Sequence, residues 1–92
     1  MSNKIFNDGS IVEWIDRETL KYLKGEFSAL VWVDFEPGFF SRGRIIKASS
    51  INEWDTKPDG VESKIDETTK KEIVERVEEY YKSFKKKYRV DW

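Results

Sequence analysis

The sequence contains no cysteine and no histidine, and these two absences exclude several kinds of protein chemistry. Without cysteine there is no disulfide, no thiol nucleophile and no thiolate zinc site. Without histidine the chain lacks the commonest general base and the commonest metal ligand in proteins. The nucleophile-elbow, phosphate-loop and dinucleotide-binding patterns are also missing. The composition therefore favours a binding protein over an enzyme, and we expect no catalytic residues and no cofactor.

Long apolar runs and a strong net charge are absent as well. No run approaches the roughly 20 apolar residues of a membrane-spanning helix, so we expect no membrane partner. The net charge is −1, from 17 basic and 18 acidic residues, which gives no bulk attraction to nucleic acid. Residues 1–66 carry 9 basic and 12 acidic groups, whereas residues 67–92 carry 8 and 6. Because the first part is acidic, nucleic acid is not an expected partner of its strands.

The 92 residues suit one small domain spanning 1–92, and its first half has the pattern of β-strands. Residues 10–16 are β-branched and aromatic, follow an Asn-Asp-Gly turn signal and form a predicted hairpin with residues 19–23. Residues 27–35 form the strongest predicted strand, and residues 44–48 form a fourth. The sheet is therefore expected over residues 10–48.

The strand at 27–35 is apolar on both faces at its middle. Leu30 and Trp32 lie on one face, and the other face carries Phe27, Ala29, Val31, Val33 and Phe35. A strand of this kind is typical of the centre of a sheet. Trp32 is therefore either part of a second small core or part of a binding face.

After a loop at 49–65, the apolar spacing changes to that of a helix over residues 66–87. Asp66 is the predicted N-cap, and the predicted apolar stripe consists of Thr69, Ile73, Val77, Tyr80, Tyr81, Phe84 and Tyr88. We expect Val77, Tyr81 and Phe84 to be buried against the sheet, and a short terminal strand within 88–92. The predicted fold is α+β: a four- to five-stranded antiparallel sheet with one long C-terminal helix packed on one face.

The loop contains one pattern that resembles a calcium-binding loop. Asp55, Asp59 and Gly60 fit its positions 1, 5 and 6. Lys57 occupies position 3 and would bring a positive charge to the ion, and position 12 is Asp66 instead of a bidentate glutamate. We therefore expect a solvated turn and no metal site.

Aromatic and basic residues also fall together around the break after the strongest strand. Phe39 and Phe40 stand between Pro37-Gly38 and Gly43, where small or polar residues are typical. They either fold over the end of the core or anchor a partner. Arg42 and Arg44 lie beside them, and cations among aromatics are also typical of proteins that hold single-stranded nucleic acid.

Three stretches resemble a family of small bacterial immunity proteins, the immunity protein 74 family. They are Lys24-Gly25-Glu26, the run 48–55 with its core Ser50-Ile51-x-x-Trp54-Asp55, and Pro58-Asp59-Gly60 before the helix. The resemblance covers roughly residues 20–85. It implies a cytoplasmic protein that neutralises a cognate toxin by covering its active site or substrate surface, and that needs no cofactor. The motif residues themselves are expected to hold the fold, with Ile51 and Trp54 packing on the sheet.

Two functions remain open at this point. The first is immunity against a toxin, which would have a basic substrate site if it were a nuclease and would then suit an acidic partner. The acidic residues expected to bind it are Asp34, Glu36, Glu53, Asp55, Asp59 and Glu62, with Phe39, Phe40 and Arg42 as further partner-binding candidates. The second is a small interaction module or a single-stranded nucleic-acid-binding module without a link to toxins.

Overall fold

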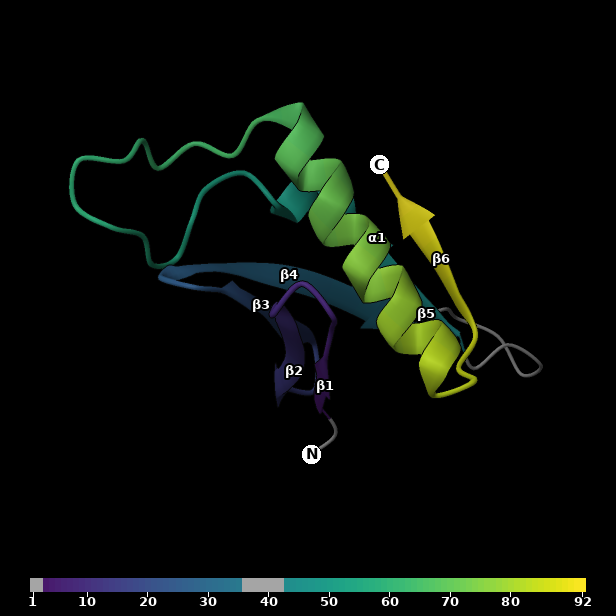
Figure 1. The fold of residues 1–92 in the computed structure, drawn as a ribbon. Coiled ribbons are helices and arrows are strands. Elements are labelled where there is room, and N and C mark those ends of the chain that lie inside the picture. The colour runs from purple at the N-terminus through teal and green to yellow at the C-terminus, as the bar shows by residue number, and fades with distance from the viewer. Residues whose placement is uncertain (1–2, 36–42) are drawn as a thin grey trace.

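A computed structural model of the chain describes residues 3–35 and 43–92. Within these residues the chain forms a six-stranded sheet, with one long helix across one face (Figure 1). The strands lie side by side in chain order: β1 (Asn3–Ile5), β2 (Ile11–Asp16), β3 (Thr19–Lys24), β4 (Phe27–Phe35), β5 (Arg44–Lys47) and β6 (Tyr88–Asp91). A short 3-10 helix, η1 (Ala48–Ser50), follows β5, and α1 spans Glu67–Ser83. The predicted α+β class and the single long helix are confirmed.

The prediction of four to five antiparallel strands is wrong in number and direction. The sheet has six described strands and is mixed. β1 was missed, since three residues are too few to show an alternating pattern. β6 pairs with β5 in parallel, with Ile46 opposite Val90. The helix between these two strands carries the chain back across the sheet, so the second strand runs in the same direction as the first.

The helix begins where its sequence predicts. The Asp66 side chain accepts a hydrogen bond of 2.7 Å from the backbone N–H of Thr69, which is the geometry of an N-cap. Hydrogen bonds from the backbone N–H and the side chain of Thr69 favour the charged carboxylate, and they lower the pKa of Asp66.

The helix ends at Ser83, four residues before the predicted end at 87. Lys85 has a positive φ of 55°, which stops the α-helical path. The N–H of Lys85 donates to the carbonyl of Lys82 (3.1 Å), and the N–H of Lys86 donates to the carbonyl of Tyr81 (3.0 Å). This pair of bonds is a Schellman motif, in which glycine is the usual left-handed residue. The sequence carries no glycine or proline there, so the end could not be predicted.

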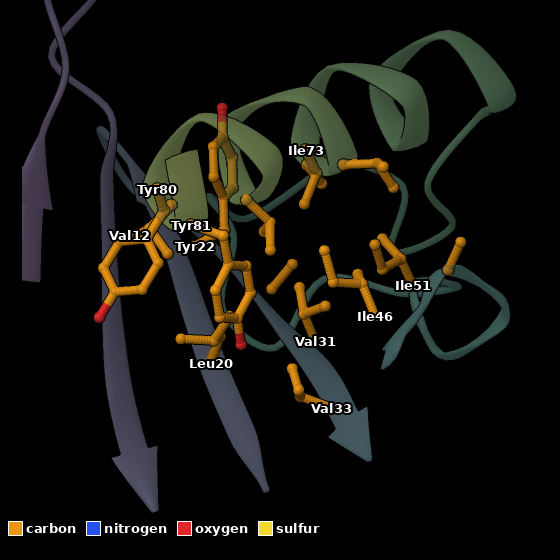
Figure 2. Close-up of a cluster of buried hydrophobic side chains, with 14 of the residues drawn as sticks. Val12, Leu20, Tyr22, Val31, Val33, Ile46, Ile51, Ile73, Tyr80 and Tyr81 are labelled. Atoms are coloured by element: carbon orange, nitrogen blue, oxygen red, sulfur yellow. The ribbon is translucent and has the colours of Figure 1, made fainter. Parts of the chain in front are cut away.

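The core lies between α1 and the sheet (Figure 2). Val77 and Tyr81 are buried as expected, and the fully buried side chains facing them include Leu20, Val31, Val33 and Ile46. The prediction that Phe84 is buried is wrong, because 39% of its surface is exposed. It is the residue that caps the helix end, where the chain already turns away from the helical stripe.

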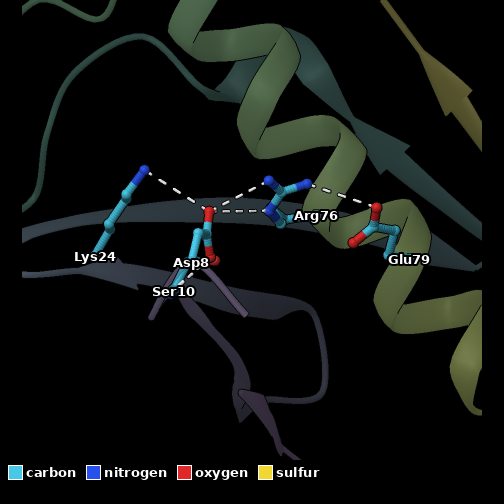
Figure 3. A network of polar contacts seen from close by, with 5 residues as sticks. All are labelled: Asp8, Ser10, Lys24, Arg76 and Glu79. Atoms are coloured by element: carbon cyan, nitrogen blue, oxygen red, sulfur yellow. Dashed lines mark hydrogen bonds and ion pairs between the residues drawn. The ribbon is translucent and has the colours of Figure 1, made fainter. Parts of the chain in front are cut away.

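The β1–β2 hairpin is attached to the helix by a polar cluster (Figure 3). Asp8 accepts hydrogen bonds from the N–H of Ser10 (2.9 Å) and from its hydroxyl (2.6 Å). A second oxygen of Asp8 lies 3.2 Å from the guanidinium of Arg76 and 3.7 Å from the ammonium of Lys24. These hydrogen bonds, together with Arg76, hold the pKa of Asp8 well below its usual range.

Candidate functional site

The face of the sheet opposite α1 carries an exposed aromatic side chain at its centre. Trp32, in the middle of β4, lies opposite Thr19 on β3 and Lys47 on β5, and 60% of it is exposed. Leu30 lies two residues away on the same strand and face. We call this surface the open face and define it by Lys21, Leu23, Leu30, Trp32, Asp34 and Lys47. Its strands are held by paired neighbours, so the surface is rigid before any partner arrives.

Two carboxylates neutralise Lys47 on the open face. The ammonium of Lys47 lies 2.8 Å from Asp91 and 3.7 Å from Asp34. The hydrogen bond that Lys47 donates to Asp91 raises the pKa of Lys47 and lowers the pKa of Asp91. Asp34, one of the predicted binding acids, is therefore engaged within the protein. The open face offers an apolar centre with balanced charge, which is typical of protein interfaces.

A loop projects beyond the start of β4 and carries most of the predicted binding acids (Figure 1). We call residues 52–65 the acidic loop. It contains two lysines, Lys57 and Lys64, and four exposed acids: Glu53, Asp55, Asp59 and Glu62. The structure therefore brings four of the predicted residues together on one projection.

Backbone bonds fix the acidic loop to the sheet. The N–H of Ser28 donates to the carbonyl of Thr56 (3.0 Å), and the N–H of Asp55 donates to the carbonyl of Ser28 (2.7 Å). The hydroxyls of Ser28 and Thr56 also share a hydrogen bond of 2.6 Å. Within the loop, the N–H of Trp54 donates to the carbonyl of Ser63 (2.8 Å). The acids therefore lie on a loop that hydrogen bonds hold against the sheet.

Trp54 anchors the base of this loop, as the sequence predicts. Its ring lies 4.8 Å from the ring of Phe27, and its side chain packs against the core. Ile51 is fully buried, and the hydroxyl of Ser50 accepts a hydrogen bond from the N–H of Trp32 (3.0 Å). The motif residues 50–55 therefore contribute to the fold. The remaining predicted site residues, Glu36, Phe39, Phe40 and Arg42, lie outside the described residues.

A second surface was not predicted, and we call it the basic groove. It lies beyond the C-terminal end of α1 and has a volume of about 1030 Å³. Its lining is Trp14, Ile15, Asp16, Arg17, Phe35, Arg44, Tyr80, Tyr81, Phe84 and Lys85–Lys87. Its cations come from three separate segments of the chain, so no local pattern in the sequence predicts the groove. The lysine run is the one visible signal, and it also suits the negative end of a helix.

Tyr81 forms the inner wall of the basic groove. Its ring packs edge-on against Trp14 (6.3 Å between centroids) and stacks on Tyr88 (5.9 Å). Its buried hydroxyl has no hydrogen-bond partner among the described residues. Burial raises the pKa of Tyr81 strongly, and the positive charge of Arg44 partly opposes this shift. At neutral pH the group is a neutral phenol that can donate or accept one more hydrogen bond.

Neither a metal cluster nor a membrane-crossing helix is found in residues 3–35 and 43–92. No three acidic side chains there converge as ligands, and Asp55 and Asp59 remain exposed on the acidic loop. No helix in the same residues is both long and apolar enough to span a bilayer.

Comparison of the chain with family models, with characterised proteins and with solved structures finds no match.

Proposed function

We propose that this chain is an immunity protein that neutralises a cognate bacterial toxin by binding it through the open face and the acidic loop. One observation carries the proposal: Trp32 is 60% exposed at the middle of a central strand, on a face that α1 does not cover. A large aromatic ring in water at such a position is unfavourable for the isolated chain. It becomes favourable when a partner buries it.

Trp32 has the properties of an interface anchor. Tryptophan is enriched among the few residues that supply most of the binding free energy of an interface. Here it stands on a rigid strand, so little conformational freedom is lost when a partner binds. The neighbouring Leu30 is half-buried and extends the apolar centre. On the β5 side of this centre, Lys47 is paired with Asp34 and Asp91.

The acidic loop supplies charge at the edge of the same surface. Its contact with the sheet, at Ser28, lies four residues before Trp32 on β4, or about 13 Å along the strand. A toxin that cleaves nucleic acid has a basic substrate site. Acids at the rim of the interface would accelerate encounter with such a site, while the aromatic centre would slow dissociation. The proposed inhibition is steric and needs no chemical step by this chain.

The test is protection of cells that express a toxin encoded beside this chain. Trp32→Ala should abolish protection, because loss of a central aromatic anchor weakens binding by roughly 30-fold or more. Trp92→Ala is the matched control, since Trp92 is 61% exposed and follows β6. It should protect like the unaltered chain. Full protection by Trp32→Ala, or equal loss with both variants, would contradict the proposal.

Self-association through the open face is the competing use of this surface. The proposal expects a monomer of 11.0 kDa in light scattering at micromolar concentration. A dimer that Trp32→Ala converts to a monomer would mean that a second copy, and not a toxin, occupies the open face.

A further inference from the structure

The basic groove is a separate concentration of positive charge at the other end of the molecule from the acidic loop. The acidic loop contacts Ser28 at the start of β4, whereas Phe35 at the end of β4 lines the groove. Of the residues that the structure describes, five cations line it, Arg17, Arg44, Lys85, Lys86 and Lys87, together with one acid, Asp16. A concave surface with this balance concentrates anions.

The groove also exposes flat aromatic surface beside these cations. Phe35 is 46% exposed, and Phe84 is 39% exposed. The guanidinium of Arg44 lies 4.2 Å above the centre of the Phe35 ring, so cation and ring present one continuous stacked surface.

At the end of α1 a lysine occupies a backbone position that is strained for any residue with a side chain. Lys85 takes the left-handed position of the Schellman motif, with φ 55°, where glycine would be unstrained. A locally unfavourable choice of this kind is typical of a functional position. The reversal carries Lys85, Lys86 and Lys87 back along the groove.

We propose that the basic groove binds nucleoside phosphates, with the phosphate among the lysines and arginines and the base stacked on Phe35 or Phe84. Aromatic rings stack on nucleobases with little dependence on the base, and cations hold the phosphates. An acidic peptide would satisfy the cations but would leave both rings without a flat partner. The acidic balance of residues 1–66 argued against nucleic acid as a partner of the strands. That argument does not hold for the groove, because the fold brings Arg17 and Arg44 from this acidic part next to Lys85, Lys86 and Lys87.

Fluorescence anisotropy of a labelled oligothymidylate of about 12 nucleotides tests the proposal. Binding should weaken by about 20-fold between 50 and 200 mM salt if roughly three phosphates are contacted. Lys86→Gln/Lys87→Gln should raise the dissociation constant about 10-fold. Lys64→Gln/Lys71→Gln removes the same charge away from the groove and should change it less than 2-fold. Equal effects of the two double variants, or no binding at 50 mM salt, would overturn the proposal.

Two further variants test the rings and the hydroxyl. Phe84→Leu should weaken binding about 10-fold, because a leucine cannot stack on a base. Tyr81→Phe should change binding less than 2-fold, since the hydroxyl that it removes is buried behind the groove wall.

Competition distinguishes the sources of the ligand. If thymidine monophosphate competes as well per nucleotide as the oligomer, the ligand is a free nucleotide. If the oligomer binds much more tightly, the ligand is a single strand. Displacement by polyglutamate or inorganic phosphate at the same concentration as the nucleotide would overturn the proposal. The groove variants should still protect against the toxin, and Trp32→Ala should still bind the oligomer, so failure here is separable from failure of the proposed immunity function.

Discussion

Lys85 shows how much a single residue determines at the end of α1. Its left-handed backbone closes the Schellman motif and turns the lysine run into the basic groove. A residue with a Cβ atom is strained in this conformation, whereas glycine is not. The same position therefore affects both stability and the charge of the groove.

Lys85→Gly should raise the free energy of unfolding by about 1 kcal/mol, because glycine relieves the left-handed strain. Chemical denaturation measures the change. The control is Lys71→Gly, at an exposed position inside the helix, where glycine should lower stability by about 1 kcal/mol. A loss of stability in Lys85→Gly would mean that the lysine side chain contributes more than its backbone strain.

Asp8 is a second residue whose environment sets a measurable property. Its pKa is lowered in the folded state by the two hydrogen bonds from Ser10 and by Arg76. A carboxyl group with a lowered folded pKa stabilises the protein above its unfolded pKa, near 3.8, and loses this contribution as the pH falls further. Folding should therefore weaken below about pH 4.

Asp8→Asn should make the free energy of unfolding less dependent on pH below about pH 4, and should lower it at pH 7. Urea denaturation at a series of pH values measures both effects. Asp59→Asn changes the net charge equally, so it shows how much of the change is a general effect of charge. An unchanged slope in Asp8→Asn would contradict the arrangement in Figure 3.

At the scale of elements, the sequence predicted those parts of the fold that have their own local signal. The β2–β3 hairpin follows from its alternating residues, and the start of α1 follows from Asp66. β1 has no such signal, and the helix end depends on a left-handed lysine. The parallel direction of β6 depends on the path of the whole helix, so a four-residue segment could not reveal it.

The same reasoning explains which surfaces could be predicted. Glu53, Asp55, Asp59 and Glu62 are close in sequence, and a braced turn keeps them close in space. The basic groove combines β2, β4, β5 and the end of α1, so its residues meet only after the sheet forms. The sequence leaves open whether Trp32 belongs to a small core or to a binding face, and only the placement of α1 shows that it lies on the open face.

At the scale of the whole molecule, opposite charges gather at opposite ends of an elongated body. The principal extents are 48 × 24 × 22 Å, with the acidic loop and the basic groove at the two ends of β4. A net charge of −1 conceals this separation. Long-range fields orient partners before contact, so each end should attract a ligand of opposite charge.

Reversing the loop charge in Asp55→Lys/Asp59→Lys/Glu62→Lys should slow association with a basic toxin by about 10-fold or more at low salt. Its effect on dissociation should be small, since rim charges act mainly during encounter. Stopped-flow kinetics at two salt concentrations measures both rates. The difference from the unaltered chain should shrink at high salt, because exposed charges are then screened.

The open face is the centre of this account, and the dissociation rate of the toxin complex tests it most directly. Surface plasmon resonance with the immobilised toxin compares Trp32→Ala and Trp92→Ala against the unaltered chain, after equal melting temperatures confirm that all three are folded. We predict that Trp32→Ala dissociates at least 30-fold faster and that Trp92→Ala dissociates at the original rate. An unchanged dissociation rate for Trp32→Ala would contradict the assignment of the open face as the toxin-binding surface.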